Sequence, residues 1–171
     1  MPVSPRDADL VSAADLAACQ ATFNEGSRTF FAASFLLPRA IRRDASALYA
    51  FCRMADDAVD RGSGGDGALE RLADRLDRIY AGRPLGVPSD RAFAGVVARH
   101  GIPRPLLDAL LEGFAWDATG RRYEALAEVL DYAARVAGTV GAMMAVIMDR
   151  RAPETIARAT ELGIAMQLTN I

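Results

Sequence analysis

The sequence predicts an all-α protein, and three of its features support this fold class. Hydrophobic residues make up 51% of its 171 residues, and the chain is rich in alanine and leucine, which both favour helices. Apolar residues recur at helical spacing, as in the segment Leu106–Phe114. Serine, glycine and proline stand where helices would begin or end. A chain of this length and composition suits one domain with its own hydrophobic core.

The composition argues against several classes of function. The formal net charge is only −2, which does not favour nucleic-acid binding. His100 is the one histidine, which leaves neither a histidine-based triad nor a Cys/His zinc site, and its place near a helix end predicts a structural role. Cys19 and Cys52 are expected to be reduced and buried, as in a cytoplasmic protein. Residues 1–10 are too polar for a signal peptide, and the apolar run 137–148 is too short to span a bilayer.

The first part of the chain predicts a tail and two helices. Residues 1–11 are expected to form a loose tail. Ser12–Asp15 resembles a capping box that opens a helix, and Gly26 is expected to end that helix. Ser27–Thr29 is predicted to form a turn. A short helix over residues 30–37 follows and stops before a proline.

A polar stripe on the next helix is the main functional signal. Pro38 suits the first turn of this helix. With about 100° between successive residues, Tyr49, Arg53, Asp56 and Asp60 fall on one face roughly 60° wide. Two carboxylates one turn apart can bind a hard cation such as Mg²⁺, and an arginine beside them suits a phosphate group. The stripe therefore predicts a metal and phosphate site if this face is covered.

Two alternatives stay open in this region. The stripe also fits a solvated helix face on which Arg53 bridges to Asp56 or Asp57. The glycine-rich segment 61–67 follows Asp60 directly. This segment fits either a plain surface connection or a lid over a phosphate site.

The second part of the chain predicts helices at residues 68–81, 89–100, 103–117, 124–149 and from 153 onward. Ser89 is expected to cap the second of these helices, and Gly101 is expected to end it. Arg104, Arg121 and Arg122 are expected to be solvated surface residues.

Glycines inside the long helix call for an explanation, because each costs about 1 kcal/mol relative to alanine. Gly138 and Gly141 occupy such positions. Either another helix packs closely there, or the helix bends around a ligand and forms the wall of an apolar pocket. In the last helix, Gly163, Gln167 and Asn170 share one face.

Three stretches of the sequence together resemble the squalene/phytoene synthase family, and the details are most similar to its bacterial phytoene synthases. The first stretch comprises Ser27–Phe31, Leu36–Arg39, Ala47–Arg53 and Ala55–Asp60; the second comprises Tyr132 with Val136–Gly141; the third is Leu162–Ile171. The resemblance runs from about Leu16 to the last residue. Three motifs in the right order make it specific.

The resemblance implies a single all-α isoprenoid-synthase bundle around a deep central cavity. It implies head-to-head condensation of two prenyl diphosphates, here two geranylgeranyl diphosphates, through prephytoene diphosphate to phytoene in carotenoid biosynthesis. The reaction would use Mg²⁺, with Mn²⁺ as a substitute, and no nicotinamide cofactor. Because the substrates are amphiphilic lipids, the resemblance is compatible with a cytoplasmic protein that contacts the inner face of the membrane.

The same resemblance assigns roles to individual residues. Asp56 and Asp60 would bind Mg²⁺ together with the diphosphate, Arg53 would contact the diphosphate, and Tyr49 would line that site. The remaining positions would bind substrate: Ser27 and Thr29 near phosphate, Tyr132, Gln167 and Asn170 around the second substrate, and Val136, Val140, Gly141 and Met144 along the prenyl channel. Arg28 departs mildly from the lysine that members of the family often have there.

The end of the sequence departs from the family pattern. Family members have a second aspartate-rich motif shortly after the position of Asn170, and this chain ends at Ile171. We therefore expect a truncated, partial domain whose isolated form lacks synthase activity. Two rival functions stay open: a squalene or dehydrosqualene synthase that uses farnesyl diphosphate, and a non-catalytic helical interaction module. The DDxxD motif of terpene cyclases fits less well, because Asp57 lies roughly 80° from Tyr49 on the helix.

Overall fold

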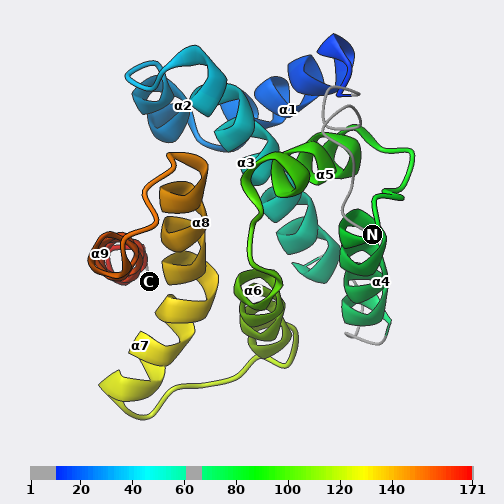
Figure 1. Cartoon of the computed structure of the whole chain (residues 1–171). Coiled ribbons are helices and arrows are strands. Elements are labelled where there is room, and N and C mark those ends of the chain that lie inside the picture. The colour runs from blue at the N-terminus through cyan, green and yellow to red at the C-terminus, as the bar shows by residue number, and fades with distance from the viewer. Residues whose placement is uncertain (1–10, 61–66, 171) are drawn as a thin grey trace. The chain divides into compact units, whose positions relative to one another are not determined.

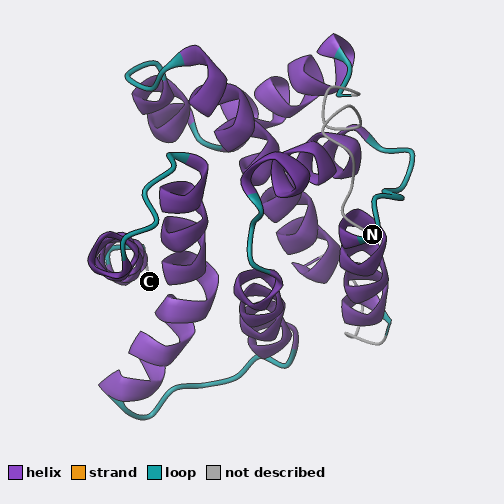
Figure 2. Cartoon of the chain, in the orientation of Figure 1, coloured by secondary structure: helices purple, strands orange, loops and turns teal. Residues whose placement is uncertain are grey.

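The structure is a computed structural model that describes residues 11–60 and 67–170, and every regular element among them is helical (Figures 1 and 2). In chain order the elements are α1 (Ala13–Gly26), α2 (Arg28–Ser34), α3 (Arg39–Asp60), α4 (Ala68–Tyr80), α5 (Pro88–His100), α6 (Arg104–Ala118), α7 (Leu126–Ala133), the π-helical turn η2 (Ala134–Gly138), α8 (Thr139–Ile147) and α9 (Pro153–Leu168). The all-α prediction is confirmed. The expected tail over residues 1–10, the glycine-rich residues 61–66 and the side chain of Asp60 lie outside the described part.

The helices form two compact units. The first unit comprises residues 1–57 and 74–101, and the second comprises residues 58–73 and 102–171. The boundary crosses both α3 and α4. The prediction of one domain stays a prediction.

The core of the first unit is built on α5. Phe93 of α5 stacks on Phe51 of α3, with ring centroids 4.5 Å apart and an interplanar angle of 20°. Both rings are fully buried. Cys19 of α1 is buried against α5, because its thiol lies 4.0 Å from the carbonyl oxygen of Pro88. Burial raises the pKa of this thiol to about 11 and that of the half-buried Cys52 to about 12, and both cysteines are free, as the sequence predicts.

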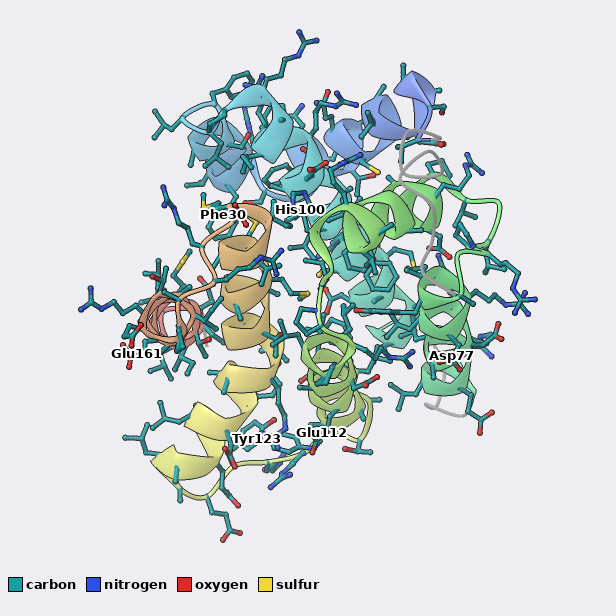
Figure 3. All side chains as sticks on the ribbon, viewed as in Figure 1. Phe30, Asp77, His100, Glu112, Tyr123 and Glu161 are labelled. Carbon is teal, nitrogen blue, oxygen red and sulfur yellow. The ribbon has the colours of Figure 1, made fainter. Side chains whose placement is uncertain are left out.

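Buried carboxylates tie the helices of the first unit to one another, each through at least one cation. Asp90 of α5 pairs with Arg75 of α4, with Nε 3.0 Å from Oδ2. Asp15 of α1 pairs with Arg91 of α5 at the same Nε–Oδ2 distance, 3.0 Å. Asp44 of α3 contacts both Arg99 (2.6 Å) and His100 (2.7 Å) of α5. Removing one partner of a buried pair leaves an uncompensated charge, so these contacts specify how the helices dock. His100 lies in the last turn of α5 and serves this structural contact (Figure 3).

The core of the second unit depends on glycines that let two helices touch. A Cβ built on Gly141 of α8 would lie 2.1 Å from the carbonyl oxygen of Ala159 in α9. A Cβ on Gly163 of α9 would lie 2.3 Å from the carbonyl oxygen of Ala137. Gly141 therefore faces the backbone of α9, and Gly163 faces the backbone of η2, so a Cβ at either position would clash. Of the two explanations for the glycines, close packing by another helix is the one observed.

The long helix predicted over residues 124–149 is not a uniform α-helix. It begins at Leu126, and its middle turn, Ala134–Gly138, is π-helical. The N–H of Thr139 donates to the carbonyl oxygen of Ala134, five residues back. A π-turn inserts one residue into the helical register, so the residues after it face a different direction from the one that an α-helix would give them.

Two predicted boundaries are wrong for local reasons. Ser27–Thr29 is not a turn, because the Ser27 hydroxyl accepts a hydrogen bond from the Phe30 N–H and caps α2, which ends at Ser34. Ser89 does not cap α5. The helix begins one residue earlier at Pro88, whose fixed φ suits a first helical position. Gly101 ends α5 in a left-handed conformation, as predicted (φ 58°).

One segment of the described residues is long and apolar enough to cross a membrane by length and composition. It runs over Leu126–Ile147 and has a mean hydropathy of 1.3. This segment contacts α6 and α9 inside the second unit, and its α8 portion is largely buried. In all, 44% of its 18-residue apolar stretch is buried inside the protein, and Leu126 and Leu130 in its α7 portion are exposed.

Candidate functional site

The predicted acidic stripe lies on α3 and is held by Arg53. This guanidinium lies 3.5 Å from an Asp56 carboxylate oxygen and 3.0 Å from one of Asp57. The bridging arginine that the solvated-face alternative predicts is therefore present, and it reaches both carboxylates. The Asp56 and Asp57 side chains are 40% and 29% exposed, so their oxygens are accessible from solution. Arg53, Asp56 and Asp57 are therefore paired with one another but remain partly exposed to solvent.

Tyr49 forms the apolar end of the same stripe. Its ring lies 4.4 Å from that of Phe23, centroid to centroid. A Cβ on Gly26 would lie 2.4 Å from the Tyr49 hydroxyl oxygen, so this glycine makes room for the phenol. Burial raises the pKa of Tyr49; the charge of Arg53 opposes this effect, and the charges of the two aspartates add to it. Tyr49, Arg53 and Asp56 therefore interact electrostatically, as their spacing predicts.

The N-terminus of α2 lies beside this phenol. Ser27 follows Gly26 directly and donates its N–H to the carbonyl oxygen of Phe23, while its hydroxyl caps α2. Thr29 is exposed in the first turn of the same helix. Because Ser27 follows Gly26, whose position faces the Tyr49 hydroxyl, the structure brings the start of α2 near that phenol.

The carboxylates of α3 fit a divalent cation by their chemistry. Asp56 and Asp57 offer accessible oxygen donors, the ligands that Mg²⁺ prefers. The side chain of Asp60, the second predicted ligand, lies outside the described part. Within residues 11–59 and 67–170, no three His, Cys, Asp or Glu side chains gather to form a complete metal site. The described residues therefore supply part of a ligand set.

Five of the predicted residues of the second unit lie on α7, η2 and α8: Tyr132, Val136, Val140, Gly141 and Met144. Tyr132 donates its hydroxyl to a carboxylate oxygen of Asp117, the last residue but one of α6, over 3.0 Å. Tyr123, from the loop between these helices, lies beside it with ring centroids 5.3 Å apart (Figure 3). Burial raises the pKa of Tyr123, and the nearby Asp117 charge adds to this effect. Asp117 and Tyr123 were not predicted as site residues; a carboxylate and a tyrosine around a loop of arginines give no periodic signal.

Two arginines lie over an indole that borders this cluster. The Arg121 and Arg135 guanidinium carbons lie 4.0 Å and 4.4 Å from the centre of the Trp116 ring. Arg135 Nε also lies 3.0 Å from a carboxylate oxygen of Glu112, at an angle that does not suit a hydrogen bond. Arg121 was expected to be a solvated surface residue. Its head stays partly exposed, but it is fixed by the indole and contributes a cation–π contact.

The apolar residues predicted to line a channel pack against different helices. A Cβ on Gly113 of α6 would meet Val136 at 2.6 Å, so Val136 packs on α6. Gly141 faces α9. Val140, Met144 and the amide side chain of Gln167 are half-buried within the second unit, whereas Asn170 is exposed beyond the end of α9.

A shallow depression of about 400 Å³ on the first unit is separate from these residues. It is lined by Asp74, Asp77, Arg78, Ala81 and Arg83 at the end of α4 and in the loop that follows. It contains none of the predicted site residues, and its mixed charges favour no particular ligand.

Comparison with known proteins gives consistent results. The family model described as squalene/phytoene synthase matches residues 23–171. Two similar curated proteins are the phytoene synthases of Cereibacter sphaeroides (53% identical over 173 residues) and Rhodobacter capsulatus (54% over 165 residues). Each alignment covers 95% of this chain but only 48% and 49% of the relative. The chain thus spans about half the length of these relatives.

Solved structures agree on the fold. A dehydrosqualene synthase crystallised with a ligand matches with a TM-score of 0.83 and 31% identity, over 91% of this chain and 55% of that protein. The squalene synthase HpnC from Alicyclobacillus acidocaldarius matches with a TM-score of 0.82 and 27% identity, over 92% of this chain and 60% of that protein. The expected helical isoprenoid-synthase fold is confirmed.

Proposed function

This chain belongs to the squalene/phytoene synthase family, and we propose that it forms the diphosphate-binding half of a phytoene synthase. The proposed reaction joins two geranylgeranyl diphosphates head to head. It passes through prephytoene diphosphate and yields phytoene for carotenoid biosynthesis, without a nicotinamide cofactor. The observation that carries the proposal is the 53% identity to a phytoene synthase over 95% of this chain.

The polar stripe of α3 is proposed as the diphosphate site. Asp56 and Asp60 would hold Mg²⁺, or Mn²⁺ in its place, which neutralises charge on a leaving diphosphate when it is bound. Arg53 would exchange its carboxylate partners for phosphate oxygens, because a guanidinium binds both in the same bidentate geometry. Tyr49 would close the apolar end of the site. Ser27 and Thr29, at the start of α2, would lie near the phosphates.

The second unit is proposed to hold the prenyl chains. Val140 and Met144 would line an apolar channel, since carbocation chemistry requires a wall without water or nucleophiles. Val136 and Gly141, which pack on α6 and on α9, would support that wall from behind. Tyr132, Gln167 and Asn170 would supply the few polar contacts around the second substrate. The π-turn supports this role, because π-turns in helices are frequent at functional sites.

The test is magnesium-dependent binding of a non-hydrolysable geranylgeranyl diphosphate analogue, measured by calorimetry with Mg²⁺ or with EDTA. We expect the double change Asp56→Ala and Asp60→Ala to abolish binding while circular dichroism stays the same. The matched control is Asp108→Ala, which removes an exposed carboxylate paired with an arginine one turn away over 2.7 Å. Unchanged affinity in the double variant would instead favour a non-catalytic helical module.

A second candidate is a squalene or dehydrosqualene synthase acting on farnesyl diphosphate. The structural match to a dehydrosqualene synthase favours it. The two candidates use substrates whose prenyl groups differ in length. Competition between C15 and C20 diphosphate analogues for binding to the protein therefore separates them. Tighter binding of the C15 analogue would decide for the second candidate. For either candidate, a cytoplasmic protein at the inner face of the membrane would meet its amphiphilic substrates there.

A further inference from the structure

We propose that Thr139 is a positioning residue, whose hydroxyl group stabilises the π-turn η2 and thereby directs the Tyr132 phenol at Asp117. These three residues and the π-turn all belong to the second unit. The meaning of this arrangement for catalysis rests on the role of Tyr132 in the proposed function. The placement of the phenol can be tested without any substrate.

The hydrogen bonds of the π-turn are rearranged at Thr139. In an α-helix the N–H of this residue would donate to the carbonyl oxygen of Arg135, four residues back. Here it donates to the carbonyl oxygen of Ala134 instead. The Thr139 hydroxyl donates to the Arg135 carbonyl oxygen over 2.6 Å and so replaces the backbone donor. Thr139 is 7% exposed, so water has little access to take over this contact.

Other hydroxyl groups of the chain make the same kind of contact in ordinary helices. Thr22 donates to the carbonyl oxygen of Ala18 in α1 over 3.2 Å, and Thr160 donates to that of Ile156 in α9 over 3.0 Å. Such contacts supplement the backbone hydrogen bonds of a regular α-helix. At Thr139 the hydroxyl instead serves a carbonyl whose α-helical donor is redirected, so its loss should act on the π-turn itself.

Glycines of two neighbouring helices make room for the π-turn. A Cβ on Gly113 of α6 would lie 2.6 Å from a methyl carbon of Val136, and a Cβ on Gly163 of α9 would lie 2.3 Å from the carbonyl oxygen of Ala137. A π-turn contains more residues per turn than an α-helix and is therefore wider. Helix packing thus accommodates the turn, while Thr139 supplies the hydrogen bond that it needs.

The π-turn decides which residue of α7 faces Asp117. The two helices α7 and α8 form one continuous ribbon with η2 between them (Figure 1). Because the turn adds one residue, Tyr132 occupies the place that Ala133 would have in an uninterrupted α-helix counted back from α8. Without the turn, the phenol would point about 100° away. In the structure it donates to an Asp117 carboxylate oxygen over 3.0 Å.

The direction of the phenol sets what it can offer a ligand. A phenol has one proton to donate, and that of Tyr132 is donated to Asp117. Its oxygen lone pair and the face of its ring remain, and these suit a positively charged or apolar group better than a phosphate oxygen. Under the proposed function, Tyr132 would therefore face the prenyl part of the second substrate and not its diphosphate.

The test is NMR of the 171-residue chain with ¹³C at the Cζ atom of its four tyrosines, because the shift of this atom responds to hydrogen bonding by the phenol. Tyr132→Phe assigns the Tyr132 signal. We expect Asp117→Asn to move this signal in the wild type. The same change should move it much less in a chain that carries Thr139→Val, because the phenol has already turned away. The Tyr49 signal, from the first unit, should stay constant.

Further variants separate the hydroxyl group from the shape of the side chain. Thr139→Ser keeps the hydroxyl and should behave like the wild type. Thr22→Val makes the same substitution in a regular helix of the first unit and should leave the Tyr132 signal unchanged. Circular dichroism checks that each variant keeps its helicity. If Thr139→Val does not fold, Thr139→Ala removes the hydroxyl without adding a methyl group in its place.

A second measurement connects this placement to the proposed function. It is the calorimetric affinity for the geranylgeranyl diphosphate analogue in the presence of Mg²⁺. If Thr139 acts through Tyr132, Thr139→Val and Tyr132→Phe each weaken binding, and the double variant binds no more weakly than the weaker of the two single variants.

Two results would overturn the proposal. One is a Tyr132 signal that Asp117→Asn moves equally far with and without Thr139→Val. The other is a double variant in which the two losses of affinity multiply, because the residues would then act independently. A wild-type chain that binds no analogue would contradict the proposed function instead, and the NMR result would still decide whether Thr139 positions the phenol.

Discussion

The phenol of Tyr132 donates a hydrogen bond to a carboxylate oxygen of Asp117 over 3.0 Å and so ties α7 to the last turn of α6. The Tyr123 ring lies beside that of Tyr132, so one carboxylate acts on two phenols. This small cluster links a predicted substrate-binding residue to neighbours that lie fifteen and nine positions away in the sequence. Its electrostatics are open to a direct test.

We predict that Asp117→Asn lowers the pKa of Tyr123. Burial is the main reason why this pKa is raised, and the Asp117 charge adds to it, so removing the charge makes the phenolate less unfavourable. Tyrosinate absorbance measured against pH should show the Tyr123 phenol ionising at lower pH than in the wild type. Tyr123→Phe identifies the signal. Asp108→Asn, on the same helix, is the control; an unchanged titration in Asp117→Asn would contradict the prediction.

We predict that Gly141→Ala destabilises the protein by about 1–3 kcal/mol, the usual effect of overpacking. The new Cβ would meet the Ala159 backbone oxygen at 2.1 Å, and backbone within a helix has little room to yield. The gain in helix propensity, about 1 kcal/mol, does not offset this clash. Urea unfolding measures the effect. Gly86→Ala, where the nearest atom lies at 3.9 Å, should change stability by less than half as much, and equal effects would refute the packing explanation.

We predict that Asp15→Asn destabilises the protein at neutral pH but not in acid. The hydrogen bond from Arg91 lowers the pKa of the Asp15 carboxyl, against the effect of burial. A carboxyl with a lowered pKa in the folded state contributes stability above its unfolded pKa, and this contribution is lost as the pH falls through the folded value. The unfolding free energies of wild type and variant should therefore differ at neutral pH and converge as the pH falls through the lowered folded-state pKa of Asp15.

A control on the same helix separates this effect from a general change in charge. Glu25 is an exposed carboxylate near the end of α1. Glu25→Gln should leave the pH dependence of stability as in the wild type. A gap between wild type and Asp15→Asn that persists in acid would show that the asparagine disturbs packing instead.

Local signals in the sequence were sufficient for most helix limits. Ser12 caps α1 by accepting the Asp15 N–H, and Gly101 ends α5, because such interactions involve residues three or four positions apart. Ser27 was placed in a turn because it follows a helix-ending glycine. It in fact caps the next helix, an equally local interaction that the pattern did not distinguish.

The candidate site was predictable only in part. The stripe on α3 follows from helical periodicity, and Arg53 indeed reaches Asp56. The solvated-face alternative named Asp56 or Asp57 as the partner of Arg53, and both contacts occur, because residues three and four positions apart are neighbours on a helix. Asp117 became a neighbour of Tyr132 through the loop between α6 and α7, and no periodic pattern encodes such a contact.

The sequence alone determined the all-α class, the acidic stripe and the family, because these depend on spacing along one helix and on motif order. Tertiary structure decided what the glycines do: Gly141 and Gly163 each press against the backbone of the facing helix. It also decided the π-turn over Ala134–Gly138 and the ion pairs of Asp15, Asp44 and Asp90. The physical reason is common to all of these. They depend on groups far apart in the chain, whose approach is set by packing between helices and not by the propensity of any one helix.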